Sequence, residues 1–111
     1  MVNLPNFIVI EKDLLLDKSL NSSTKILYAL ISTLANNKDK VCYASNKYLA
    51  SLLGYDIRSI QRMINDLVNG DYIQVYYKKN NRMIKPQILE PMHIRELKKQ
   101  FGDIDIEELL F

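Results

Sequence analysis

The sequence has 111 residues, 48% of them hydrophobic and 25% charged, which fits one globular domain and excludes a disordered chain. Its formal net charge of +2 is too small to indicate a nucleic-acid partner by itself. The longest apolar run, residues 26–31, is far shorter than the roughly 20 residues that span a bilayer. No signal peptide is visible in the sequence. We therefore expect a cytoplasmic protein that contacts no membrane.

The residue patterns of enzyme and metal sites are missing from the sequence. There is no paired Cys/His set for zinc and no glycine-rich phosphate loop, and the only histidine, His93, is far in sequence from the only cysteine, Cys42. A single cysteine excludes an internal disulfide, and its apolar neighbours predict that Cys42 is a small buried hydrophobic residue. We expect neither catalysis nor a bound metal or cofactor.

The first part of the chain predicts a strand and a helix. Residues 7–10 are β-branched and aromatic, so they predict a short strand, whereas the leucines at residues 14–16 fit either a helical turn or an extended connection. A longer helix is predicted to begin near residues 21–24, whose hydroxyl and amide side chains can cap free N–H groups. Its apolar face repeats at helical spacing: Ile26, Leu27, Leu30, Ile31 and Leu34. The polar residues 36–40 end this helix.

Two further helices are predicted close together. Ser45 caps a short second helix that Gly54 ends, because glycine readily adopts the left-handed conformation of a tight exit. Asp56 caps a third helix over residues 57–69. Its apolar residues are predicted to form one buried stripe: Ile57, Ile60, Ile64, Leu67 and Val68. Because Ala50 is small, the two helices can pack closely and cross at a steep angle.

The pattern then becomes strand-like. Residues 72–77 are rich in strand formers, residues 79–81 predict a turn, and residues 82–85 predict a second strand, so together they predict a β-hairpin with a basic tip. Three aromatic residues are expected to pack in the sheet and core: Tyr72, Tyr76 and Tyr77. A short helix is expected after residue 91, followed by an acidic segment over residues 103–111.

The outer face of the predicted third helix is polar and consists of Arg58, Ser59, Gln61, Arg62 and Asn65. A helix with such a face fits the major groove of DNA, where Arg can pair with guanine and Gln or Asn with adenine. Arg58 is the first candidate for a base contact because it projects from the first turn. Two alternatives stay open: Arg62 can pair with Asp66 four residues later, and Ser59 can either contact a phosphate or satisfy the helix start.

Phosphate contacts are predicted at two other places. Ser45 and Asn46 lie where the second helix begins, and a helix N-terminus suits a phosphate, although ordinary capping explains the same residues. The predicted hairpin tip carries Lys78, Lys79, Asn80 and Arg82, together with Asn81. Such a tip commonly neutralises phosphates without reading sequence. The alternative is a solubilising turn that discourages edge-to-edge pairing.

From about residue 7 to residue 89, the chain resembles the winged helix-turn-helix domains at the front of bacteriophage and plasmid replication initiators and in related phage regulators. The resemblance is carried by Ser-Asn at 45–46, Leu-Ala-x-x-Leu-Gly at 49–54, Ser-Ile-Gln-Arg at 59–62 and Asn-Gly-Asp-Tyr-Ile at 69–73. It implies DNA binding through the third helix, with the hairpin touching the backbone or minor groove. Such initiators usually carry a further domain, so this shorter chain favours a small regulator, an accessory replication factor or an excised domain.

The predicted fold class is α+β: a winged helix-turn-helix with a three-helix core, a β-hairpin wing, a short N-terminal strand and a C-terminal helical tail. Residues 1–90 form the predicted domain and residues 91–111 the tail. The predicted function is sequence-specific binding of double-stranded DNA in phage or plasmid replication initiation or transcription regulation, with a recognition helix at residues 57–69 and a basic wing at residues 78–82. A homodimer would match palindromic sites.

The acidic segment favours a second hypothesis, a winged helix that binds protein as a replication adaptor or as a phage-encoded inhibitor of a host complex. Its candidate partner-binding residues are Ile104, Ile106, Leu109, Leu110 and Phe111. The segment is loosely similar to the acidic, phenylalanine-ending tail of bacterial single-stranded DNA-binding proteins and to sliding-clamp peptides, although it lacks the glutamine that the latter favour. It could instead pack on this domain or on a second copy, or fold over the basic wing.

Overall fold

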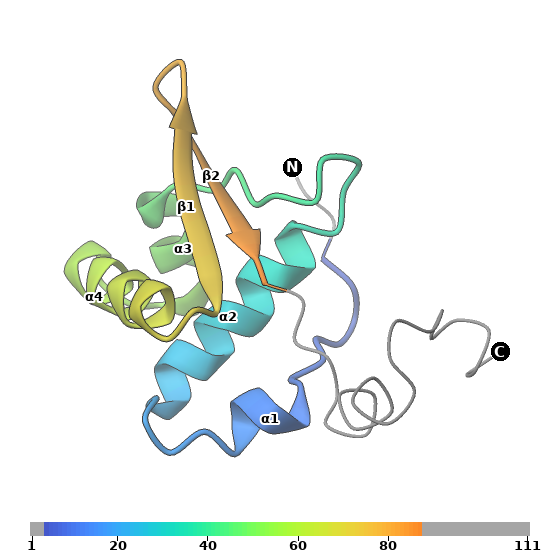
Figure 1. Ribbon diagram of the computed structural model, residues 1–111, viewed down its shortest axis with the longest axis vertical. Coiled ribbons are helices and arrows are strands. Elements are labelled where there is room, and N and C mark those ends of the chain that lie inside the picture. Colours follow the sequence, from blue (N-terminus) through green and yellow to red (C-terminus); the bar gives the residue numbers. More distant parts are fainter. Residues whose placement is uncertain (1–3, 88–111) are drawn as a thin grey trace, which may run out of the picture.

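The computed structural model describes residues 4–87, so the predicted tail and its candidate partner-binding residues lie outside the described residues. The elements are α1 (Lys12–Leu15), α2 (Ser22–Leu34), α3 (Asn46–Leu53), α4 (Ile57–Asn69), β1 (Ile73–Lys78) and β2 (Asn81–Pro86). Helices followed by an antiparallel hairpin confirm the winged helix-turn-helix prediction (Figure 1). Of the two interpretations of the leucines at residues 14–16, the structure supports the helical turn: Leu14 and Leu15 lie in the short helix α1, and Leu16 is its C-cap.

The three longer helices begin at the polar residues that the sequence predicts. The side chains of Asn21, Ser45 and Asp56 each accept a hydrogen bond from a backbone N–H three residues later, at 2.8, 3.1 and 2.6 Å. Each bond satisfies one of the N–H groups that a helix leaves free at its start, which is worth about 1 kcal/mol. These caps therefore fix where each helix begins.

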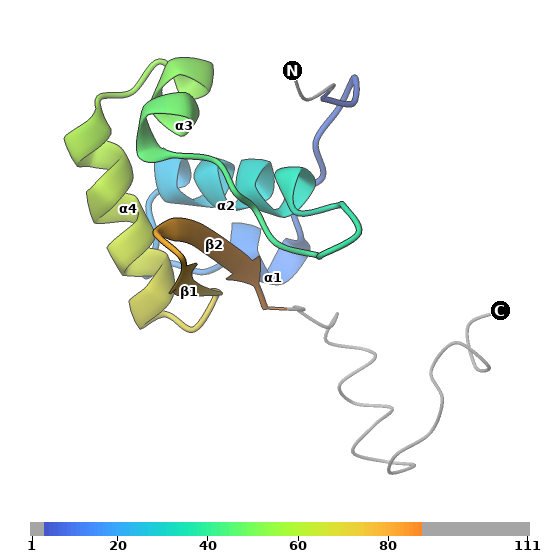
Figure 2. The same ribbon diagram turned by 90° about the horizontal axis from the view of Figure 1, so that it is seen from above.

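The core lies where α2 meets α4 and the hairpin (Figures 1 and 2). Its fully buried side chains come from helices, the connection before α3 and both strands: Leu14, Leu27, Ile31, Cys42, Leu49, Ile60, Leu67, Ile73 and Ile84. The predicted burial of Cys42 is confirmed, and burial also raises the pKa of its thiol. Among residues 4–87, no helix is both long and apolar enough to cross a membrane.

Three residues predicted to be in apolar stripes are instead exposed. Ile26 on α2 is 41% exposed, and Ile57 and Val68 on α4 are 51% and 39% exposed. The stripe of α4 is narrower than predicted because it follows Ile60 and Met63 at helical spacing, and residues 57 and 68 lie to one side of that line. The prediction of a single stripe through Ile57 and Val68 was therefore wrong at its two ends.

The predicted N-terminal strand does not form. Residues 7–10 have no strand assignment and are exposed, with Phe7 75% and Val9 71% exposed. The side of β2 at Ile84 is taken by Cys42, through N–H to O bonds of 2.7 and 2.9 Å. The backbone groups of Ile84 on that side are therefore already paired and are not available to a further strand.

The hairpin is a regular antiparallel pair with a two-residue turn. Lys78 pairs with Asn81, so the turn residues are Lys79 and Asn80, with φ angles of 52° and 68°. Positive φ at both central residues is the signature of a type I′ turn, which matches the twist of the flanking strands. Asn81 therefore begins β2, although the sequence analysis assigned it to the turn.

The tyrosines divide along the hairpin. At its base, the ring of Tyr72 contacts the ring of Tyr28 edge-on with centroids 5.7 Å apart, and its hydroxyl donates to Asp17. Tyr76 and Tyr77 lie in the sheet, on β1, but are 37% and 71% exposed, so of the three tyrosines predicted to pack in the sheet and core only Tyr72 packs against the core. Nearer the tip, the strands have no apolar layer to cover them, which leaves the end of the hairpin in solvent (Figure 1).

Candidate nucleic-acid interface

The helix α4 has one buried face and one exposed polar face. The buried face consists of Ile60, Met63, Ile64 and Leu67, each 3% exposed or less. The predicted site residues Arg58, Gln61, Arg62 and Asn65 are all exposed, and Ser59 is half-buried. A long polar face on a helix anchored by its other face gives a rigid row of hydrogen-bonding groups, and α4 provides one.

A tight turn holds α3 and α4 in a fixed relation. Gly54 ends α3 with a φ of 73°, and the N–H groups of Gly54 and Tyr55 both donate to the carbonyl oxygen of Ala50, at 2.9 and 3.2 Å. This is the left-handed exit predicted for the glycine. Ala50 is buried, as its predicted role in close helix packing requires, and Leu49 beside it is fully buried.

Four side chains form a chain of hydrogen bonds that runs from the hairpin across α3 to α4. The guanidinium of Arg82 donates to Asn46 Oδ1 at 2.5 Å and to the carbonyl oxygen of Ala44 at 2.6 Å. Asn46 Nδ2 donates to Gln61 Oε1 at 2.9 Å, and Gln61 Nε2 donates to Asn65 Oδ1 at 3.2 Å. We call the series Arg82, Asn46, Gln61, Asn65 the amide relay. The amide relay joins the three predicted contact regions, which are the hairpin, the start of α3 and the exposed side of α4.

The start of α3 combines a cap and the relay. Ser45 is exposed, and its Oγ accepts from the backbone N–H of Tyr48, so the capping role is present. Asn46 is half-buried and uses both ends of its amide within the protein. The two residues, which were predicted to act alike, therefore differ, because only Asn46 bonds to other predicted contact residues.

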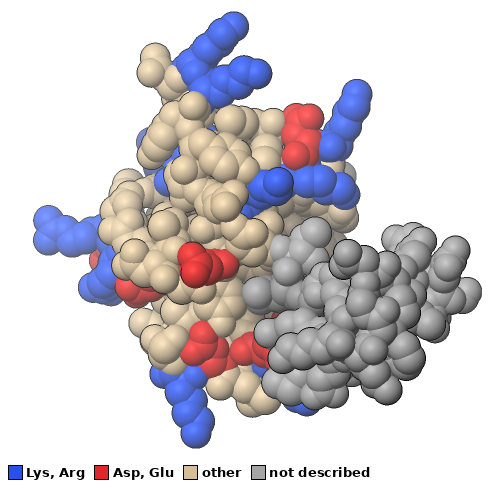
Figure 3. All heavy atoms as spheres, viewed as in Figure 1, with Lys and Arg blue, Asp and Glu red and all other residues tan. Residues whose placement is uncertain are grey.

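The hairpin tip is basic and exposed. Lys78, Lys79, Asn80 and Asn81 are all exposed, whereas Arg82 is half-buried and bonded to α3 and to the connection before it. Figure 3 shows Lys and Arg side chains projecting at the hairpin tip and beside α4. The tip thus carries the lysines that were predicted there, while Arg82 faces back toward the helices.

A carboxylate lies at the start of α4. Hydrogen bonds from Ser59 lower the pKa of Asp56, and the positive charges of Arg62 and Arg58 lower it further. Asp56 therefore stays ionised at neutral pH, and its charge complements the positive end of the helix dipole.

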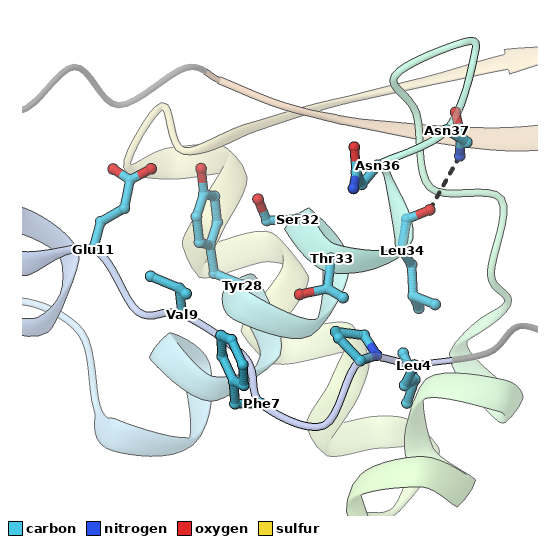
Figure 4. A pocket seen from close by; sticks show the side chains of 11 residues that line it. Leu4, Phe7, Val9, Glu11, Tyr28, Ser32, Thr33, Leu34, Asn36 and Asn37 are labelled. Carbon is cyan, nitrogen blue, oxygen red and sulfur yellow. Dashed lines mark hydrogen bonds between the residues drawn. The ribbon is translucent and has the colours of Figure 1, made fainter. Parts of the chain in front are cut away.

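A pocket of about 860 Å³ lies between residues 4–11 and α2, away from this surface (Figure 4). One wall carries apolar side chains such as Phe7 and Val9, and the other carries polar groups such as Ser32 and Asn36. None of its lining residues belongs to α3, α4 or the hairpin. Across residues 4–87, no cluster of His, Cys, Asp and Glu could hold a metal ion.

This arrangement of helices matches a known family. The helix-turn-helix domain family matches residues 18–73, which is half of the chain. The chain belongs to this family. The matched range of the helix-turn-helix domain runs from the turn before α2 to the first residue of β1, so it contains the whole α3–α4 unit. No curated protein was found to match the sequence.

Two solved structures share the fold of this helix-turn-helix domain. One, described as "N-Terminal domain of DNA binding protein", is 18% identical, with a TM-score of 0.62 over 89% of this chain and 88% of that chain. The other, "Structure of Rep-DNA complex", is 17% identical, with a TM-score of 0.61 over 89% of each chain. At these identities the likeness shows the fold. It confirms the predicted resemblance, and it extends beyond the residues that the family covers.

Sequence reasoning missed the internal bonds of Arg82 and Asn46. Both were treated as free to contact phosphate, but their partners are each other, Ala44 and Gln61. Arg82 is 36 residues away from Asn46, so no local pattern indicates the contact. One sequence signal does set Arg82 apart from the tip lysines. It lies four residues past Lys78, on the second strand and not in the turn, so it can face a different surface.

Proposed function

We propose that this helix-turn-helix domain binds double-stranded DNA in a sequence-specific manner, with α4 in the major groove and the hairpin tip on the backbone. One observation carries the proposal: the exposed side of α4 carries base-reading side chains, namely Arg58, Gln61, Arg62 and Asn65, while the opposite face is anchored in the core. The major groove is wide enough to admit an α-helix. A rigid helix presents its side chains at fixed places, which base recognition requires.

The side chains of α4 offer the groups that base edges need. The guanidinium groups of Arg58 and Arg62 can donate two hydrogen bonds to guanine, and the amides of Gln61 and Asn65 can donate to and accept from adenine. Each good bidentate pair is worth about 1–3 kcal/mol of discrimination against the wrong base. In this proposal Ser45 and Ser59 lie toward the phosphates, because both are at helix starts.

The backbone conformation of the hairpin tip supports a role for its charge. Lys79 has a φ of 52° in a turn where asparagine and glycine are the favoured residues. A lysine costs more there than asparagine does, so its presence favours a use for its ammonium group. We propose that Lys78 and Lys79 neutralise phosphates, with Asn80 beside them at the tip.

We extend the proposal to replication initiation or transcription regulation of the phage or plasmid kind. Support comes from the two solved structures of the same fold, one of a DNA-binding protein and one of a Rep–DNA complex. The protein-binding hypothesis rests on residues 103–111, which lie outside the described residues, so no structural observation favours it.

A selection experiment tests the proposal. The full chain is used to capture duplexes from a random-sequence library at moderate salt, and the enriched duplex is measured against a scrambled one. Arg58→Ala should weaken binding to the enriched duplex by about 1–3 kcal/mol. Lys12→Ala is the matched control, since it removes one exposed positive charge on α1, at the opposite end from the hairpin tip. Equal losses in the two variants, or no enriched duplex, would refute the proposal.

A further inference from the structure

We infer that Arg82 and Asn46 are positioning residues that fix the direction of the Gln61 and Asn65 amides, and so determine which base this surface selects. The inference rests on the proposed function, and it assigns these two residues a role other than phosphate contact. The evidence is the amide relay, in which the four side chains are joined by three successive hydrogen bonds.

The relay has a single direction because it starts at an arginine. An amide side chain has an oxygen that only accepts and a nitrogen that only donates, whereas a guanidinium has donors alone. Arg82 therefore requires the Oδ1 of Asn46 to face it, which turns Nδ2 of Asn46 toward Gln61. An amide surrounded by water can turn over at little cost, but one beside a donor-only partner cannot.

The direction of the Asn46 amide also fixes the directions of the Gln61 and Asn65 amides on α4. Because Asn46 offers its nitrogen, Gln61 must offer Oε1, and its Nε2 is then turned toward Asn65 Oδ1. The amide of Asn65 keeps both N–H groups and one lone pair of Oδ1 for another partner. The relay thus fixes a donor and an acceptor side by side on the exposed face of α4.

A fixed donor beside a fixed acceptor matches the edge of adenine in the major groove. Adenine presents the acceptor N7 next to the donor N6–H, and an amide pairs with both at once. If the amide were turned over, its oxygen would face N7 and its nitrogen would face N6, so both contacts would be repulsive. We therefore assign adenine as the base that Asn65 selects, with Arg82 setting the direction of the amide from 17 positions along the chain.

The second bond of Arg82 holds the arginine in place. It donates to the carbonyl oxygen of Ala44 at 2.6 Å while it donates to Asn46, and the side chain is half-buried. Two fixed partners hold the planar guanidinium more firmly than one. The hairpin thereby acts on base selection through α3, without itself entering the major groove.

The first test compares Arg82→Met with Lys79→Asn on the duplex enriched by the full chain. The adenine read by Asn65 is identified first, as the position at which Asn65→Ala no longer prefers adenine. Discrimination is then the ratio of the affinity for the enriched duplex to the affinity for a duplex with another base at that position. We expect Arg82→Met to reduce it roughly 5- to 150-fold while leaving the slope of log affinity against log salt unchanged. Lys79→Asn should do the reverse, keeping discrimination and flattening the slope by about 0.9, the value of one phosphate contact.

The second test leaves the hairpin intact. Asn46→Asp still accepts from Arg82, but it cannot donate to Gln61, so the amides downstream are released or reversed. Ser45→Asp adds the same negative charge one residue away and keeps an N-cap, since aspartate caps as well as serine does. We expect Asn46→Asp to lose discrimination at the adenine and Ser45→Asp to retain it, while both lose overall affinity to a similar extent.

The outcomes separate the inference from the function beneath it. A wild-type chain that enriches no duplex would overturn both. A wild-type chain that discriminates, with an Arg82→Met variant that keeps its discrimination and loses salt dependence, would overturn the inference alone and make Arg82 a phosphate contact. Equal discrimination in Asn46→Asp and Ser45→Asp would also overturn it. Thermal unfolding of each variant provides the control for folding.

Discussion

Helix α4 and the hairpin tip both present polar groups to solvent, but they are supported in opposite ways. At α4 the cap and the centre of the apolar stripe agree with the structure: Asp56 caps the start, and the inner face is buried at helical spacing. At the tip, Lys79 occupies a left-handed conformation that asparagine or glycine would adopt more readily. The helix is held from beneath along its length, whereas the tip extends beyond the core and depends on its own turn (Figure 1).

Under the proposed function, this difference matches the two kinds of contact with DNA. Reading a base requires side chains fixed to within a fraction of an ångström, so the reading face belongs on an element that the core supports. Neutralising a phosphate requires a charge in the right area, and a flexible lysine on a small turn is sufficient. The two regions should therefore respond differently to substitution. On α4 the change in stability depends on how buried the substituted side chain is. On the tip, the changes in stability and binding depend on turn conformation and charge.

The largest expected effect is on the buried face of α4. Leu67 is fully buried, so Leu67→Ala should lower the free energy of unfolding by about 2–5 kcal/mol. Val68→Ala, at the next position, should cost less than about 1 kcal/mol, because Val68 is 39% exposed. Urea unfolding of the two variants measures the contrast. Similar losses would mean that the buried stripe is as broad as the sequence alone predicts.

The turn between α3 and α4 should show a smaller and purely conformational effect. A Cβ added at Gly54 meets no atom within 4 Å, so Gly54→Ala encounters no clash. Its φ of 73° remains, and holding alanine there should cost about 1–2 kcal/mol. Gly54→Asn is the matched variant and should cost less, since asparagine tolerates this conformation. If unfolding showed asparagine to be as costly as alanine, crowding rather than φ would be the cause.

How far the sequence predicts this molecule depends on how local each cause is. The starts of the longer helices and the exposed face of α4 follow from caps and periodicity, which are properties of neighbouring residues, and Ser45, Gly54 and Asp56 lie where expected. The strand at residues 7–10 was predicted from composition alone, but a strand also needs a partner strand, and local sequence does not show which segments pair, such as Cys42 with Ile84.

The candidate site divides in the same way. Exposure of Arg58, Gln61 and Asn65 could be predicted from their spacing alone. The relay could not, because Arg82 and Asn46 meet only after the hairpin folds back beside α3. Period and composition identify which side chains face solvent, but they carry no information on which solvent-facing side chains bond to one another.

The stability contributed by the base of the hairpin should depend on pH. Hydrogen bonds from Ser19 and from the hydroxyl of Tyr72 lower the pKa of Asp17 from 3.8 to about 2. A lowered carboxyl pKa contributes stability in full above pH 3.8, and the contribution is lost as the pH falls toward 2. Burial and the bond to Asp17 raise the pKa of Tyr72 from 10.0 to about 12. The contribution of Tyr72 to the free energy of unfolding is therefore lost as the pH rises from 10.0 to 12.

Tyr72→Phe tests this pH dependence. It removes one of the bonds to Asp17, so the pKa of that carboxyl should rise and the loss of stability between pH 3.8 and 2 should become smaller. The alkaline loss should shrink but not vanish, because burial also raises the pKa of Tyr28 to about 12. Urea unfolding at a series of pH values gives both limbs. An acid limb identical to that of the wild type would show that Tyr72 does not support Asp17.

The smallest effect on stability is expected at the tip. Lys79→Asn places a favoured residue at φ 52°, so the free energy of unfolding should rise by no more than about 1 kcal/mol. Binding should weaken alike for all duplexes, because a charge and not a base contact is removed. Asn80→Gly is the control, since it suits a φ of 68° equally well and changes no charge. It should leave both the free energy of unfolding and the salt dependence of binding nearly unchanged. A Lys79→Asn variant that became more stable and bound DNA as tightly as before would show that the left-handed lysine serves neither the turn nor the phosphate backbone.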